Sequence, residues 1–149
     1  MALIGFFNII GSLAAGWIGQ RYSKPYFLAF IYIGRSITVT LFLLLPQTPL
    51  SVVIFAAVMG LLWLSTVPPT NGLVAIMFGT RHLGLLGGLV FLSHQIGSFL
   101  GVWMGGYLYD HFGTYDQVWW LGVGLGIFAA VVHWPIREKA VERPALGMA

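Results

Sequence analysis

The chain has 149 residues, of which 58% are hydrophobic and only 7% are charged. An ordinary soluble domain has about 25% charged residues, so this chain lacks the charged surface that a soluble fold of its size needs. The mean hydropathy of +0.89 favours a lipid bilayer as the solvent, and the length then suits a handful of membrane spans rather than several domains.

Five apolar segments approach the roughly 20 residues that a helix needs to cross a hydrocarbon core. The predicted spans cover residues 2–20, 25–45, 50–65, 83–109 and 118–136. After the third span, the sequence TVPPTNG is expected to break the helix, and residues 73–82 to form a short amphipathic piece at the interface. The sequence therefore predicts an all-α polytopic membrane protein, with a transmembrane bundle over residues 1–136 and a tail over residues 137–149.

The basic residues lie in alternate connections between the predicted spans. These residues are Arg21 and Lys24 after the first span, Arg81 after the third, and Arg137, Lys139 and Arg143 after the fifth. The other two connections, PQTP and DHFGTYDQ, contain neither Lys nor Arg. Because basic residues favour the cytoplasmic side, we expect the tail to be cytoplasmic.

This orientation places Met1 on the opposite side of the membrane, with no polar segment before it. A cleaved signal peptide is an alternative explanation. Such a peptide has its basic residues before the apolar run, whereas Arg21 follows the run here. We therefore expect the chain to be a piece of a longer protein.

Small residues recur at every fourth position in two of the predicted spans. They are Gly97, Gly101 and Gly105 in the fourth span, and Gly11, Ala15 and Gly19 in the first. Such a stripe lets another helix approach closely, so that van der Waals packing can hold the two together in lipid. Plain helix packing explains the pattern, and a smooth face also suits helices that slide or rock against one another.

Polar residues in the middle of a span are candidates for function, because they are costly in hydrocarbon unless they face protein or water. Ser93, His94 and Gln95 form such a cluster in the fourth span. The imidazole titrates near neutral pH, and Gln can both donate and accept hydrogen bonds. We expect either solute or proton binding at this cluster, or a hydrogen bond between helices.

Arg35 lies ten residues into the second span, and no Asp or Glu occurs in any predicted span. Its partner must then be a carbonyl group, a water-filled cavity or a part of the protein outside this sequence. An anionic ligand is one hypothesis, and a structural role is the other. Asn8 and Trp63 are weaker candidates, which helix packing also explains.

Sequence motifs of enzymes and of nucleic-acid-binding proteins are absent. The sequence has no G-x-S-x-G, H-E-x-x-H or G-x-x-x-x-G-K motif and no paired carboxylates within a predicted span. Its few basic residues are divided among three loops, which argues against a nucleic-acid interface. We predict no catalytic residue, no cofactor and no metal site.

The sequence GWIGQRYSKP resembles the cytoplasmic loop signature of the major facilitator superfamily of transporters. Gly16, Arg21 and Lys24 match this signature, whereas Gln20 stands where an acidic residue is usual and Ser23 where a second Gly is usual. The order of spans resembles spans eight to twelve of the usual twelve. Residues 65–120 resemble bacterial relatives of the monocarboxylate and oxalate/formate carriers, but without the basic residue usual in the eighth or eleventh span.

The resemblance implies alternating access, in which two six-helix halves rock about a site near the membrane midplane. The lipid bilayer, a small solute with a proton or counter-ion, and the missing N-terminal half are the partners it implies. His94 and Gln95 become the first candidates for the cavity, and a small organic anion is one candidate solute. The alternative is a truncated or non-transporting membrane remnant or assembly subunit.

Overall fold

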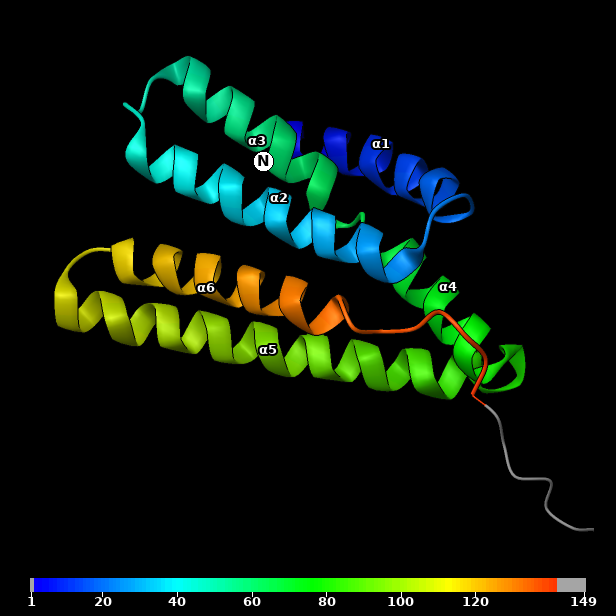
Figure 1. Ribbon diagram of the computed structural model, residues 1–149. Coiled ribbons are helices and arrows are strands. Elements are labelled where there is room, and N and C mark those ends of the chain that lie inside the picture. The colour runs from blue at the N-terminus through cyan, green and yellow to red at the C-terminus, as the bar shows by residue number, and fades with distance from the viewer. Residues whose placement is uncertain (1, 142–149) are drawn as a thin grey trace, which may run out of the picture.

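The computed structural model describes residues 2–141, and this part of the chain is helical, with no strand. Its helices are α1 (Ala2–Gly19), α2 (Lys24–Leu44), α3 (Pro49–Trp63), α4 (Val67–Phe78), α5 (Leu83–Phe112) and α6 (Asp116–His133), with a short 3-10 helix, η1 (Thr80–His82), before α5 (Figure 1). The all-α prediction is confirmed.

Local sequence explains where several helices begin and end. Pro25 lies in the first turn of α2, where its missing N–H costs no helical hydrogen bond. Thr48 caps α3: its hydroxyl accepts a hydrogen bond from Ser51 N at 3.1 Å, and its own N–H donates to Ser51 Oγ at 2.8 Å. The helix α5 ends at Gly113, whose φ of +70° is readily adopted only by glycine.

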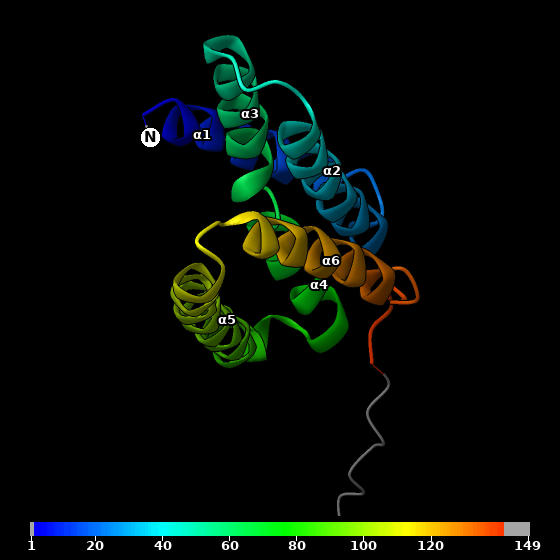
Figure 2. The ribbon, with the colours of Figure 1, turned by 90° about the vertical axis from the view of Figure 1, so that its left-hand side faces the viewer.

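The helices pack in pairs. The helix α1 lies against α3, and α2 lies against both α6 and α3, whereas α5 touches its neighbours mainly near its ends (Figures 1 and 2). Val39, Met59 and Val123 form a small core cluster between α2, α3 and α6. In α5, only Gly105 is buried, so one long face of this helix has no covering within the described residues.

Five helical segments are long and apolar enough to cross a membrane: Ala2–Gly19, Lys24–Leu44, Pro49–Phe78, Thr80–Phe112 and Asp116–His133. Large apolar side chains are exposed along all of them, as expected of surfaces that face lipid. The connections after α1 and α4 and the segment after α6 lie at one end of the bundle, and the two remaining connections lie at the other (Figure 1). The basic residues described in the connections therefore share one end.

The third span differs from its prediction. The break covers only residues 64–66, and the two prolines predicted to interrupt the helix lie in the first turn of α4. Proline is accepted there because the first residues of a helix donate no helical hydrogen bonds. Of the segment expected at the interface, residues 73–78 instead end a 30-residue helical segment long and apolar enough to cross a membrane, and Thr80–His82 form η1.

Candidate solute site at the broken third span

The break between α3 and α4 interrupts a membrane span near its middle and frees backbone polar groups. A helix end leaves up to four carbonyl groups without a helical partner, and Pro68 and Pro69 have no N–H to offer to the preceding turn. Non-helical backbone at membrane depth is tolerated only where protein or a water-filled cavity satisfies it. The side chains around this break therefore show how the freed backbone groups are satisfied.

Arg35 of α2 reaches the carbonyl groups at the end of α3. Its Nε and Nη2 donate to Leu62 O at 3.1 and 2.6 Å, and Nη2 also donates to Trp63 O. The guanidinium carbon lies 5.5 Å from the Tyr32 ring centroid and 5.8 Å from that of Trp63. The negative end of the α3 dipole favours a cation here. Of the three partners considered for Arg35, the described residues supply the carbonyl groups.

Asn8 of α1 reaches the same break from another side. Its Oδ1 accepts a hydrogen bond from Leu64 N at 3.1 Å, and Ser65 Oγ donates to Leu61 O. The structure thus brings together three candidates from distant parts of the sequence, Asn8, Arg35 and Trp63. Ser65 is a contributor that sequence reasoning missed, although its position directly before a proline-rich segment could have indicated it.

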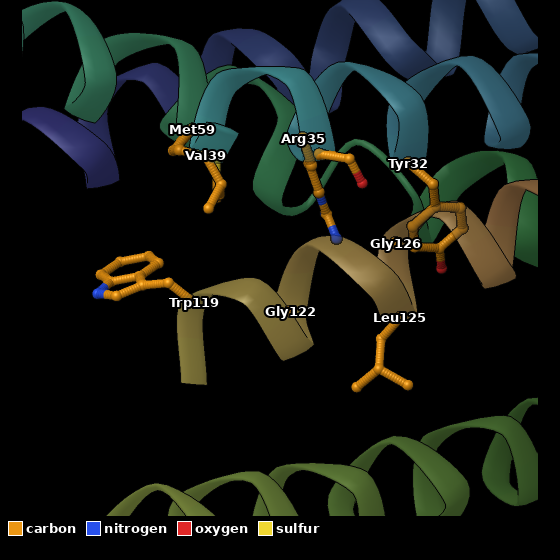
Figure 3. A pocket seen from close by; sticks show the side chains of 9 residues that line it. Tyr32, Arg35, Val39, Met59, Trp119, Gly122, Leu125 and Gly126 are labelled. Carbon is orange, nitrogen blue, oxygen red and sulfur yellow. The ribbon is translucent and has the colours of Figure 1, made fainter. Parts of the chain in front are cut away.

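A pocket of about 310 Å³ opens beside Arg35, between α2, α3 and α6. Figure 3 shows the Arg35 side chain extending from α2 toward α6, with Val39, Met59 and Trp119 to one side of it, whereas the Leu125 side chain points away from Arg35. The residues that line the pocket are Tyr32, Arg35, Ser36, Val39, Met59, Trp119, Gly122, Leu125 and Gly126. Arg35 is the one charged residue among them.

The polar cluster of α5 lies apart from this site. Ser93, His94 and Gln95 are all exposed, and Ser93 Oγ donates to Val90 O of its own helix at 2.8 Å. The His94 ring lies 6.5 Å from Phe91, also in α5. Within residues 2–141, the structure therefore does not join this cluster to the broken span.

The two glycine stripes have different surroundings. Gly11, Ala15 and Gly19 are buried in α1, and a Cβ atom added to Gly11 would lie 2.7 Å from the carbonyl carbon of Leu61. Gly60 of α3, which the sequence analysis missed, is equally close to Ile4 and Phe7. In α5, a Cβ atom added to Gly105 would lie 3.9 Å from Val118 Cγ1, whereas one added to Gly97 or Gly101 would have no described atom within 4 Å.

The loop signature lies at the end of the bundle that collects the basic residues. Gly16 has Pro68 as a neighbour, Gln20 is exposed, and the Arg21 guanidinium lies 3.9 Å from the Trp17 ring centroid. Lys24 Nζ forms an ion pair with Glu138 Oε1 at 2.6 Å.

Glu138 joins the segment after α6 to the start of α2. The Lys24 backbone N–H donates to Glu138 Oε2 at 2.8 Å, which places a carboxylate at the positive end of α2. Burial by itself raises the pKa of the Glu138 carboxyl, but hydrogen bonds from the Lys24 side chain and backbone, together with the Lys24 charge, hold the pKa below its usual range. Sequence reasoning missed Glu138, because its partner is 114 positions away.

The profile of the Major Facilitator Superfamily matches residues 1–147. This chain belongs to the Major Facilitator Superfamily. It is therefore an integral membrane protein of a family of transporters rather than of enzymes.

A relative of this major facilitator chain is the "Uncharacterized MFS-type transporter YcxA" of Bacillus subtilis (strain 168). The two are 29% identical over 151 residues, which cover 95% of this chain and 37% of the relative. The chain thus spans little more than a third of that transporter. No solved structure shows a significant match.

Proposed function

We propose that this chain is part of a secondary transporter that moves a small solute across the bacterial cytoplasmic membrane by alternating access. The observation that supports this function best is the broken third span, where Asn8 and Arg35 hold the free peptide groups near mid-membrane. Discontinuous helices near the midplane form the solute and ion sites of many secondary transporters. A cation at this depth favours an organic anion as the solute.

Transport in this proposal requires no covalent chemistry. It requires that two conformations bind the solute, or a coupling proton, with different affinities. The hydrogen bonds to the break join α1, α2 and the third span, so a change in packing among these helices changes the backbone groups that a solute can reach. His94 and its neighbours Ser93 and Gln95 are the proposed site of proton coupling, because a histidine side chain can bind and release a proton.

We further propose that the missing N-terminal half of the transporter is the partner of this bundle. The match to only 37% of the relative supports this assignment, and so does the face of α5 around Gly97 and Gly101, which has no described neighbour. The end of the bundle with Arg21, Lys24 and Arg81 is proposed to be cytoplasmic, together with the tail.

Solute uptake into membrane vesicles that contain the transporter of which this chain is a part tests the function. A panel of small carboxylates and neutral solutes is supplied, with and without an imposed pH gradient. We expect the gradient to drive uptake of at least one solute and His94→Ala to abolish the pH dependence with normal membrane insertion. Vesicles that take up no solute would favour the non-transporting remnant or assembly subunit, and unchanged pH dependence in His94→Ala would exclude His94 as the coupling residue.

A further inference from the structure

The pocket beside Arg35 has an uneven distribution of charge. Its lining combines one guanidinium with the apolar residues Val39, Met59 and Leu125 and the Trp119 ring, and no lining residue is acidic. The ion pair seen in the described part of the chain joins Lys24 and Glu138 and does not involve Arg35. The positive charge is thus offset by backbone carbonyl groups and the faces of aromatic rings, but by no carboxylate.

Arg35 also keeps hydrogen-bond donors for a ligand. Its Nε and Nη2 donate to the carbonyl groups of Leu62 and Trp63. None of the hydrogen bonds that Arg35 forms within residues 2–141 uses Nη1. A guanidinium has five N–H groups and no acceptor, so the two donors of Nη1 can bind an anionic oxygen while the other donors hold the broken span.

The opposite wall leaves room for the body of such a ligand. Gly122 and Gly126 of α6 line the pocket, and Figure 3 shows them facing the Arg35 side chain across the space between the helices. A Cβ atom added to Gly122 would have no described atom within 4 Å, whereas one added to Gly126 would clash with Ser36 Oγ, so the open part of this wall is at Gly122. The volume of about 310 Å³ lies at the lower end of the range for small-molecule sites, which is about 300 to 1,000 Å³.

We infer that this pocket binds an amphipathic monoanion, a carboxylate on an apolar or aromatic body, with the carboxylate on Arg35 Nη1 and the body against Val39, Met59 and Trp119. Hydrogen bonds between a cation and a carboxylate are stronger than those between neutral groups, and the apolar lining residues suit the body of the ligand. That the bound anion is cargo rests on the proposed transport function, whereas the binding itself does not.

Two glycines of α6 provide a matched test. Gly122→Leu fills the pocket, whereas Gly124→Leu adds the same side chain to a residue that does not line it. Neither glycine has a described atom within 4 Å of an added Cβ, so both variants are expected to fold. Arg35→Gln removes the charge but also the hydrogen bonds to α3, so its effect on folding must be measured alongside binding.

The experiment is equilibrium binding of radiolabelled benzoate and of radiolabelled palmitate to the purified transporter in lipid nanodiscs, with benzyl alcohol as the neutral control. We expect saturable binding of at least one anion, weakened about tenfold or more by Gly122→Leu and unchanged by Gly124→Leu. Preference for benzoate identifies an aqueous solute, and preference for palmitate identifies a ligand from the membrane.

The inference is overturned if neither anion binds, if benzyl alcohol binds as well as benzoate, or if the two leucine variants bind equally. Binding is measured without transport, so a failure of the pocket to bind an anion can be distinguished from a failure of the chain to take part in transport. Uptake without binding in this pocket would leave the transport proposal standing, and binding without uptake would leave the anion site standing.

Discussion

At Gly11, the absence of a side chain allows the backbones of α1 and α3 to come into contact. An added Cβ atom would lie 2.7 and 2.9 Å from the carbonyl and α carbons of Leu61. Gly60 of the facing helix is under the same constraint from Ile4 O at 2.7 Å. Because backbone atoms cannot rotate away as a flexible side chain can, a larger residue at either position must push the two helices apart.

Replacement of Gly11 by Ala should therefore destabilise the bundle by about 1 to 3 kcal/mol, the usual cost of overpacking. Gly5→Ala is the matched control, because Gly5 lies in the same helix with no described atom within 4 Å; it should change stability by no more than about 1 kcal/mol. The free energy of unfolding can be measured by circular dichroism in micelles with increasing SDS. Equal stability of the two variants would contradict the close approach at Gly11.

At the scale of the helix, the third span is stable as two pieces because its neighbours satisfy the break. Asn8 supplies an acceptor from α1 and Arg35 supplies donors from α2. These contacts join residues 56 and 27 positions apart in the sequence. A helix that continued through this level would have no carbonyl groups free to accept from Arg35, so the break and the half-buried cation depend on each other.

Asn8→Ala should lower the free energy of unfolding by about 0.5 to 1.5 kcal/mol, the range measured for hydrogen bonds between membrane helices. Thr38→Ala is a suitable control, because Thr38 Oγ1 donates to Gly34 O of its own helix at 2.7 Å and joins no other element. Hydrogen exchange at Leu64 provides a local measurement. Exchange that stays slow in Asn8→Ala would show that the Asn8 side chain does not protect this amide.

The segment after α6 is a second link between elements, through Glu138. Since the pKa of Glu138 is held below its usual range, its carboxylate contributes stability that is present above the ordinary value of 4.5 and is lost as the pH falls through the lower value in the folded state. Glu138→Gln should therefore have a lower free energy of unfolding than the wild type at pH 7. The difference should be no more than about 1 kcal/mol, because the pair is partly exposed.

The difference between wild type and Glu138→Gln should shrink only below pH 4.5, where the wild-type carboxylate becomes protonated. Thermal unfolding measured from pH 3 to pH 8 by tryptophan fluorescence is the test. Asp110→Asn controls for a general effect of removing a carboxylate. Asp110 lies near the C-terminal end of α5 and takes no part in the contact between Lys24 and Glu138. A difference that is independent of pH would mean that the ion pair is not its source.

At the scale of the whole molecule, the bundle is uneven. The pairs α1 with α3 and α2 with α6 are packed, whereas α5 has just one buried residue along its 30 positions. The small residues Gly97 and Gly101 lie on this helix without a described neighbour. This pattern supports the proposal that another part of a larger transporter packs against α5.

Gly101→Leu should weaken assembly of the complete transporter while leaving the described bundle intact, because no described atom lies within 4 Å of the added Cβ. Gly106→Leu is the matched control. At about 100° per residue, Gly106 is turned about 140° around the helix from Gly101, and an added Cβ atom there also has no described atom within 4 Å. Thermal stability and size-exclusion profiles in detergent distinguish the two. Identical profiles for both variants would count against packing of a partner at this face.

The number of spans, the helical fold and the grouping of basic residues at one end were all predictable from the sequence alone. Apolar run length, breakers and the position of Lys and Arg are local properties, and in lipid they largely determine where helices form. The family was also recognisable from GWIGQRYSKP and the order of spans, as the match over residues 1–147 confirms.

Only the tertiary structure decided which polar residues meet. Arg35 had three candidate partners in the sequence, and packing of α2 beside the end of α3 selected the carbonyl groups of Leu62 and Trp63. Glu138 and Gly60 had no distinctive pattern, because their partners are far away along the chain. Pairing between helices depends on their rotation and crossing, and a difference of one residue in register turns a side chain by about 100°, which a local pattern does not specify.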